Sequence, residues 1–499
     1  MRPPLIQRPR RSAQRRTPER GVTMALVALS LVAIIAMAAL SIDVGTLYQA
    51  SAEAQRAADA AALAAARVIS ISGLTGDPSN GSGSWGGICG GPGSSANLTA
   101  VAVAAQNTVG GTSPPPPSVT YSYVGGVSAP SCVSLINSAF AVNPLVTVKV
   151  QQPSLPTFFA HVFGLVNKNW GTVSVSGTAT AEAFNPSNSG AYSGGTLIPV
   201  QPRCVKPWFV PNQDPSAGTC VGSACNPIVN TTNGQIWTSG VYPLGVIGER
   251  FWLNPDCAVG TTPCTLLGQP EANYPGVSAP GKPNLQYVPS QVSSPSTAIP
   301  SIDPGSAACA NVAASTGYYS PAIAGCDQST QYQCGSSYPA DTVDLTENPA
   351  YPSGSGDSAN GVQCLIHQSL QPTASQPSGQ DVLAPGAFNL LPPPPTYPFQ
   401  IQPGTSNPLT GLAGTGTAVT SSTSIVSLPI YDNSQSIAPA GTTPVTVIGF
   451  LQVFINDVDQ NGNVDVTVMN VSGCGNDATG TPVHGTSSVP VRLITPPSS

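Results

Sequence analysis

The sequence is poor in charge, because Asp, Glu, Lys and Arg together make up only 8% of its 499 residues, where about 25% is usual. It contains only three His. General acid–base catalysis needs ionisable groups held close together, and this chain offers few. It also lacks the phosphate-binding loop, the HExxH zinc motif, the G-x-S-x-G motif and the glycine pattern of dinucleotide-binding folds. We therefore expect a protein that is not an enzyme, with no catalytic residues, no cofactor and no small-molecule substrate.

The few charges are unevenly placed. Residues 1–70 hold nine Arg against four carboxylates, whereas the rest of the chain holds seven basic and eighteen acidic residues. An acidic bulk disfavours nucleic acid as a partner. Seven of the Arg precede the run VTMALVALSLVAIIAMAALSI at 22–42, which carries no charge.

At about 1.5 Å per residue this run matches the roughly 30 Å core of a bilayer. The Arg-rich end of a span stays in the cytoplasm. We therefore expect a single pass through a bacterial inner membrane, with the N-terminus cytoplasmic and the bulk of the chain periplasmic or extracellular. The alternative is a cleaved signal peptide with AMA at 36–38 as its cleavage site, although the apolar region of such a peptide is usually about 7–15 residues long.

No cysteine precedes the span, and all 12 lie between positions 89 and 474. An even number of cysteines in an exported region predicts disulfides. Zinc is the weaker alternative, because no CxxC pair occurs and the His are scattered. By spacing, Cys220 with Cys225 and Cys257 with Cys264 are suited to closing small loops.

Residues 22–69 contain no proline, and their only glycine is Gly45. Good helix formers dominate 47–67. We therefore expect one helix of about 48 residues, the second half of which leaves the membrane. Its apolar stripe consists mostly of small side chains and so allows close approach: Leu47, Ala50, Ala54, Ala58, Ala61, Ala65 and Val68.

After the helix, the Gly/Ser composition of 71–95 predicts a flexible loop. A small α+β domain follows, with expected helices at 95–111 and 155–164 and expected strands at 144–150 and 171–183.

The rest of the chain mixes short apolar strands with Pro/Ser/Gly segments, and 275–306, 368–386 and 402–424 have the composition of linkers. Near the end, 442–471 contains two β-rich runs around Asn461-Gly462, which predicts a hairpin. The expected fold is α+β, with a β-rich, disulfide-containing extension joined by linkers. The expected parts are a cytoplasmic tail (1–20), the long helix (21–70), the small domain (71–185) and the extension (186–499).

The long helix also carries a series of residues typical of one family. Arg20-Gly21 precede the span, Ile42-Asp43-Val44-Gly45 and Tyr48 lie at its outer edge, and Gln55 is followed by Ala58-Asp59-Ala60-Ala61-Ala62-Leu63. This series resembles the N-terminal segment of the TadE/TadG-like proteins of the Flp, or tight-adherence, pilus system, and the resemblance extends over about residues 1–185.

The resemblance implies a pseudopilin-like helix in the inner membrane. It also implies a non-catalytic role in assembling or anchoring Flp-type pili, with other Flp/Tad pilus-assembly proteins as partners. The family-motif residues are Gly21, Asp43, Gly45, Tyr48, Gln55 and Asp59.

Three positions on the helix have a more specific expectation. Prepilin-type processing cuts after a Gly that is followed five residues later by Glu. Five residues after Gly21 this chain has Leu26 instead, so we expect the N-terminus to stay uncleaved. Asp43 is expected to end the span at the outer interface. Asp59 has three open alternatives, namely a pair with Arg56, a pair with a basic residue of a partner, or a solvated helix face.

The segment DVDQNGNVD places Asp457, Asp459, Asn461 and Asp465 in the spacing of a calcium loop. Val468 stands where the bidentate Glu belongs, so these residues are weak calcium candidates and we expect no other metal site. Asp432, Ser434 and Ser436 resemble the first metal loop of von Willebrand A domains, yet too little chain follows for the rest of that fold.

The calcium candidates leave an alternative function, namely a membrane-displayed adhesin or calcium-dependent binding module on a generic anchor.

Overall fold

The computed structural model describes residues 20–72, 85–123, 125–135, 140, 143–156, 172–185, 199–215, 226–232, 234–237, 245–257, 264, 266, 283–292, 307–313, 317–327, 329–335, 340–347, 357–368, 379–384, 400–407, 419, 422–459, 462–474, 483–485 and 488–494.

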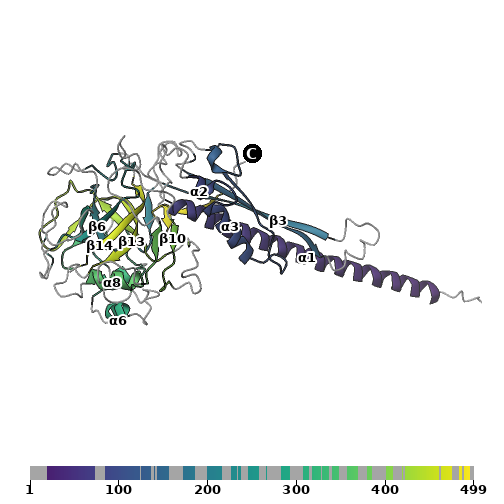
Figure 1. Ribbon diagram of the computed structural model, residues 1–499. Helices are drawn as coiled ribbons and strands as arrows, with labels where there is room; N and C mark the ends of the chain where they lie inside the picture. The colour runs from purple at the N-terminus through teal and green to yellow at the C-terminus, as the bar shows by residue number, and fades with distance from the viewer. Residues whose placement is uncertain are drawn as a thin grey trace, which may run out of the picture.

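The described part of the chain begins with one continuous helix, α1 (Arg20–Ile71), which is 52 residues long. It confirms the single long helix expected from the absence of proline, and it extends slightly beyond both expected ends. Figure 1 shows α1 extending away from the body of the protein at its N-terminal end, while its other end reaches the body. Its first half is exposed, and most of the small apolar stripe of its second half is buried.

The second half of α1 packs on a four-stranded antiparallel sheet. The strand order is β1-β2-β3-β16, with bounds β1 (Ser118–Ser122), β2 (Leu145–Pro156), β3 (Thr172–Ala183) and β16 (Val491–Ile494). Successive side chains of a strand point to opposite faces, and the buried positions alternate accordingly at Val146, Val148 and Val150 on β2. These residues and the Ala stripe of α1 form one hydrophobic core.

Helices on another side of α1 complete this domain. They are α3 (Ser95–Gln106), α2 (Trp85–Cys89) and the short 3-10 helix η1 (Cys132–Leu135). The helix expected at 95–111 is confirmed as α3 at its start, but it ends at Gln106, and Val109 forms a bridge with Thr112 instead. The loop expected over 71–95 was wrong in part, because Trp85 and Ile88 of α2 are fully buried in the core and order that segment.

Two further expectations for this domain need correction. The short helix expected at 155–164 was wrong at its start, because Leu155 and Pro156 belong to β2, where they pair with β3. The rest of that segment lies outside the described residues. The fourth strand, β16, comes from the end of the chain, which no local pattern in the sequence indicates.

The extension contains a closed six-stranded barrel in the order β11-β13-β14-β6-β7-β5. Its strands are β5 (Trp208–Pro211), β6 (Arg250–Pro255), β7 (Asn284–Pro289), β11 (Ile425–Tyr431), β13 (Val447–Val458) and β14 (Val464–Gly473). The antiparallel pair β13–β14 confirms the predicted hairpin, and Gly462 at its turn has φ +81°. The linker expected over 275–306 was wrong in part, because it contains β7.

Smaller elements surround the barrel. Three two-stranded sheets join β9 with β10, β8 with β12, and β4 with β15. Their bounds are β4 (Val200–Pro202), β8 (Thr342–Asp344), β9 (Val382–Ala384), β10 (Gln400–Gln402), β12 (Thr442–Pro444) and β15 (Val483–Gly485). The helices are α6 (Ala307–Ala313), α7 (Tyr319–Ala324) and α8 (Asp357–Leu365), of which Figure 1 labels α6 and α8 beside the barrel. Among the described residues, the linkers expected at 368–386 and 402–424 were wrong at β9, at Gln402, which ends β10, and at Val419, which forms a single bridge with β10.

Disulfides hold both parts of the chain. The described pairs are Cys89–Cys132, Cys204–Cys326, Cys257–Cys264, Cys309–Cys364 and Cys334–Cys474. The predicted small loop between Cys257 and Cys264 is confirmed, whereas Cys220 and Cys225 lie outside the described residues. Together these features confirm the α+β class with a disulfide-containing, β-rich extension.

Candidate functional site

The first half of α1 is apolar and open to its surroundings. Its most apolar 18-residue window has a mean hydropathy of 2.7 and is almost entirely exposed. By length and composition it is suited to cross a membrane. The exposed large apolar side chains here are Met24, Leu26, Val27, Leu29, Leu31, Val32, Ile34, Ile35, Met37, Leu40, Ile42 and Val44. Such a surface is stable in lipid and costly in water.

The family-motif residues near the outer end of this segment have different surroundings. Asp43 is only 2% exposed and lies on the same face of α1 as Ala50 and Ala54, which pack on the sheet. Tyr48 is 75% exposed. In the part of the chain that the structure describes, a Cβ placed at Gly45 would meet no atom within 4 Å. Gly21 lies in α1, but its surroundings are outside the described part of the structure.

Gln55 joins α1 to the edge of β3. Its Nε2 donates to the carbonyl oxygen of Thr178 at 3.0 Å, and its Oε1 accepts from the Thr178 N–H at 3.2 Å. Strand β16 pairs with β3 only as far as Thr180. The carboxamide of Gln55 therefore provides the next donor and acceptor along this edge, where an open strand would leave backbone groups unpaired. Nε2 also donates to Asp59 Oδ1 at 2.8 Å, which fixes the orientation of the amide.

A glycine makes this contact possible. A Cβ at Gly177 would lie 2.4 Å from the carbonyl oxygen of Ala54 and 2.5 Å from the Gln55 nitrogen. A lone glycine inside a strand often marks a close backbone approach. That rule identifies Gly177 in the sequence, although it does not identify the partner helix.

Glu53 attaches α1 to the turn that follows α3. Its Oε2 accepts from the Gly110 N–H at 2.8 Å, and its Oε1 accepts from Gln49 Nε2 at 3.0 Å. The hydrogen bond from Gly110 and then that from Gln49 lower the pKa of the Glu53 carboxyl. Gly110 and Gly111 both have positive φ, a conformation that favours glycine, so these two residues shape the turn, which begins after α3 has ended at Gln106.

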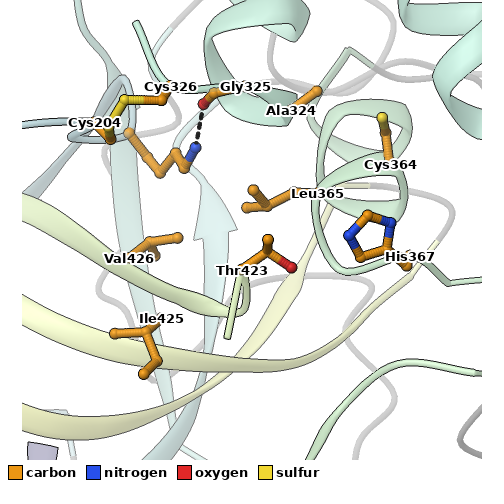
Figure 2. Close-up of a pocket in the computed structure, with 11 residues that line it drawn as sticks. Cys204, Ala324, Gly325, Cys326, Cys364, Leu365, His367, Thr423, Ile425 and Val426 are labelled. Atoms are coloured by element: carbon orange, nitrogen blue, oxygen red, sulfur yellow. Dashed lines mark hydrogen bonds between the residues drawn. A yellow bond between two sulfur atoms is a disulfide. The ribbon is translucent and has the colours of Figure 1, made fainter. Parts of the chain in front are cut away.

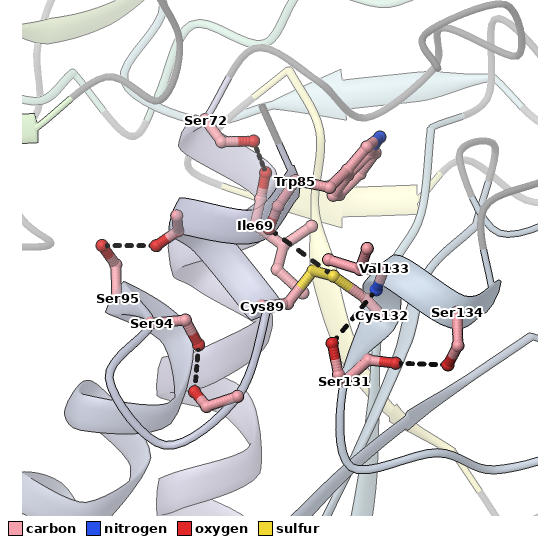
Figure 3. The surroundings of a disulfide bond; sticks show 12 residues. Ile69, Ser72, Trp85, Cys89, Ser94, Ser95, Ser131, Cys132, Val133 and Ser134 are labelled. Atoms are coloured by element: carbon pink, nitrogen blue, oxygen red, sulfur yellow. Dashed lines mark hydrogen bonds between the residues drawn. A yellow bond between two sulfur atoms is a disulfide. The ribbon is translucent and has the colours of Figure 1, made fainter. Parts of the chain in front are cut away.

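The Cys89–Cys132 disulfide fastens the layer that covers α1. It joins α2 to η1, and the Cys132 sulfur also lies 3.6 Å from the Trp85 carbonyl oxygen (Figure 3). Trp85 stacks edge-on against Phe140 with ring centroids 5.3 Å apart. The second half of α1 is thus held by internal contacts of this chain on the sheet side and on the α3 side.

The C-terminal end of α1 docks on the barrel. Asn470 of β14 donates through Nδ2 to the carbonyl oxygen of Ser70 at 3.2 Å. Ile71 belongs to a small hydrophobic cluster with Phe454 and Met469 of the barrel. Burial lowers the pKa of Arg67 to about 10 at this junction. The helix is therefore a continuous connection from the apolar segment to the barrel.

The calcium candidates are engaged in contacts within the protein. Asp465 accepts from Arg250 through Nε at 2.9 Å and Nη2 at 2.6 Å. Asp457 accepts from Gln368, and Asp459 accepts from the backbone and the side chain of its neighbour Asn463. The fourth candidate, Asn461, lies outside the described residues. Within the described part of the chain no three His, Cys, Asp or Glu gather as a metal site would require, and calcium binding here stays a prediction.

The von Willebrand-like segment forms an exposed turn after β11. There Asp432 Oδ1 accepts from the backbone N–H of Ser434 at 3.0 Å. The segment is thus a polar turn after a strand, closed by a hydrogen bond of its own.

Comparison with known protein families gives a match in the N-terminal region. Residues 21–68 match the family described as putative Flp pilus-assembly TadE/G-like. No curated protein and no solved structure matches the chain. The match confirms the family resemblance of the N-terminal region, supports a role related to the Flp pilus and associates the chain with a membrane. It covers 48 of 499 residues, so the resemblance expected further along, to residue 185, stays a prediction.

Proposed function

We propose that this chain is a membrane-anchored, TadG-like protein that assembles or anchors Flp-type pili, and that it does so without catalysis. In this proposal the N-terminus lies in the cytoplasm, the first half of α1 crosses the inner membrane, and the sheet domain and barrel lie outside. Its partners are other Flp/Tad pilus-assembly proteins, which contact the exposed half of α1.

The observation that supports this role is the contrast between the two halves of α1. The second half is held by the sheet, by α3 and by the barrel, so its small residues are used within this chain. In the first half, in contrast, Ala39 and Asp43 are the only buried residues among 23–45, where the structure describes burial. The junction contains Gly45, which has open space around it.

No described residue explains why position 45 is glycine. A glycine inside a helix costs about 1 kcal/mol relative to alanine, and in the described part of the structure a Cβ at Gly45 would meet nothing within 4 Å. Small residues in membrane helices allow another helix to approach closely. Gly45 therefore supports lateral packing of α1 against a helix of a pilus-assembly partner.

The test is complementation of a strain that lacks the gene. We expect Gly45→Leu to accumulate normally, because the added side chain meets open space, but to reduce surface pili and attachment strongly. Leu40→Phe is the matched control, because it adds bulk at another exposed position of the same helix and should complement fully. Normal piliation with Gly45→Leu would contradict packing through this surface. If the deletion strain kept normal pili but no longer attached, this would contradict the assembly role and favour a displayed binding module.

Two measurements test the anchor and its orientation. Intact mass and N-terminal sequencing of the membrane protein should show no cleavage beyond loss of Met1, whereas a new start at Val22 or after Ala38 would contradict a permanent anchor. A cysteine introduced as Ser12→Cys should react with a membrane-impermeant maleimide only after the inner membrane is opened. Labelling in intact spheroplasts would show the opposite orientation.

A further inference from the structure

A pocket of about 200 Å³ opens beside the barrel, between the start of β11, the end of α7 and the turn after α8. Figure 2 draws the eleven residues that line it. The walls are apolar at Ala324, Leu365, Ile425 and Val426, and the Cys204–Cys326 disulfide forms part of the rim. Three side chains with hydrogen-bonding groups complete the lining: Lys206, His367 and Thr423.

The backbone around this pocket is strained. Only three non-glycine residues in the described chain have positive φ, namely Ser154, Cys204 and His367. Two of the three, Cys204 at +59° and His367 at +56°, line this pocket. A non-glycine residue in this conformation costs on the order of 1–3 kcal/mol, and such residues gather at binding sites.

Lys206 is a buried amine at the same pocket. Its Nζ donates to the carbonyl oxygens of Ile323 at 2.6 Å and Gly325 at 2.7 Å, and the second of these bonds is dashed in Figure 2. An ammonium has three protons, so one remains beyond these two hydrogen bonds. Burial lowers the pKa of Lys206 to about 7, and the nearby charge of Asp327 opposes this shift.

His367 has an unused ring nitrogen. Its Nε2 is buried and has no hydrogen-bond partner among the described residues. A buried polar group left without a partner costs about 1–3 kcal/mol, and such groups are uncommon in native proteins. Figure 2 draws this ring with Leu365 and Thr423 among the residues that line the pocket. A ligand that accepts a hydrogen bond there would remove this cost.

We propose that this pocket binds a small carboxylate with a short aliphatic body, with Lys206 and His367 holding the carboxylate and Leu365 and Val426 covering the body. The size agrees, because a cavity of about 150 Å³ holds one benzene and this one is somewhat larger. The carboxylate comes either from a free short-chain acid or from the C-terminus of a peptide. This binding activity is separate from the proposed role of α1 in the pilus.

The test is isothermal titration calorimetry on the full chain in nanodiscs, with empty nanodiscs as the blank. Hexanoate is the probe for a free acid, and N-acetylleucine is the probe for a peptide C-terminus. Hexanol, hexylamine and N-acetylleucine amide have similar bodies without the carboxylate and should not bind. Saturable binding of hexanoate alone identifies a free acid, and tighter binding of N-acetylleucine identifies a peptide end. Absence of saturable binding of both acids up to about 20 mM overturns the proposal.

A proton measurement separates this site from an incidental apolar cavity. At pH 8 the Lys206 amine is largely neutral, and an adjacent carboxylate favours its charged form. Binding at pH 8 should therefore take up close to one proton, which appears as a dependence of the heat on the ionisation enthalpy of the buffer. At pH 6 Lys206 is already charged. Asp327 and His367 are the titratable groups at this site besides Lys206, and the His367→Asn variant separates the contribution of the imidazole. Binding without proton uptake at pH 8 contradicts the role of Lys206.

His367→Asn is the decisive variant, because Asn tolerates positive φ but lacks the imidazole. We expect it to unfold at an equal or higher temperature than the wild type and to bind the acid about tenfold more weakly. Ser154→Asn is the matched control, since it makes the same kind of replacement at a strained position on β2, and its affinity should be unchanged. Lys206→Met should abolish binding where it folds. Unchanged affinity in His367→Asn overturns the proposal whether or not Lys206→Met folds.

Discussion

Replacing Gly177 by alanine tests how the long helix is attached to the sheet. The added Cβ would lie 2.4 Å from the Ala54 carbonyl oxygen, 2.5 Å from its carbon and 2.5 Å from the Gln55 nitrogen. All three are backbone atoms of a helix, so no side chain can rotate away. The helix and β3 must therefore separate by about 1 Å to restore an ordinary contact of 3.4 Å or more.

Two terms give the magnitude. Overpacking of this kind costs about 1–3 kcal/mol. The separation also weakens the two hydrogen bonds between Gln55 and Thr178, each worth about 1 kcal/mol. We expect the free energy of unfolding of the sheet domain to fall by about 2–4 kcal/mol.

Hydrogen–deuterium exchange of the full chain in detergent micelles measures this locally. Exchange of peptides from β3 should accelerate roughly thirty- to several-hundred-fold, since 1.4 kcal/mol is tenfold, while peptides from the barrel strand β13 serve as the internal reference. Gly45→Ala is the matched control on the same helix and should leave exchange in β3 unchanged or slower. If β3 of the Gly177→Ala variant exchanged at the wild-type rate, the close contact would be refuted.

Three further predictions concern other contacts. Gln55→Ala should destabilise the sheet domain by about 1–2 kcal/mol, which the same exchange experiment detects; no change would show that the amide is solvated. Replacing Cys89 and Cys132 by Ser removes a cross-link between positions 43 residues apart and should cost about 2–4 kcal/mol, read as a lower urea midpoint; an unchanged midpoint would contradict this. Burial raises the pKa of Asp341 to about 8 and lowers that of Lys206 to about 7. Between about pH 4 and 8 the folded chain keeps a proton on Asp341 that the unfolded chain has lost, so stability falls as pH rises. Between about pH 7 and 10 the unfolded chain keeps a proton on Lys206 that the folded chain has lost, so stability rises. Urea midpoints should therefore be lowest near pH 7–8, and a flat profile would contradict both shifts.

The elements predicted correctly are those that local patterns determine. The absence of proline and the Ala-rich composition were sufficient for α1, and Asn461-Gly462 between two β-rich runs was sufficient for the β13–β14 pair. The Cys257–Cys264 loop followed from its short spacing. In each case the residues that determine the structure are close in sequence.

The features that were missed depend on pairing between distant segments. Strand β7 carries no alternation strong enough to separate it from its Pro-rich surroundings, and only the neighbouring barrel strands order it. Strand β16 has four residues and pairs with a strand more than 300 positions earlier. The pocket was missed for the same reason, since Lys206, His367 and Thr423 come from three segments that only the barrel brings together.

The return of β16 to the first sheet makes the barrel an insertion. The chain leaves β3 at Phe184 and comes back at Pro490, and the Phe184 N–H donates to the Pro490 carbonyl oxygen at 2.9 Å. Arg492 then pairs with Glu182 at 2.8 Å and lies over the Phe184 ring. The points where the chain leaves the first sheet and returns to it are thus adjacent. The region between them, which contains the barrel, is attached to the sheet at both of its ends. The sheet domain is therefore complete only when β16 has been synthesised, so it begins to form before the barrel and is finished after it.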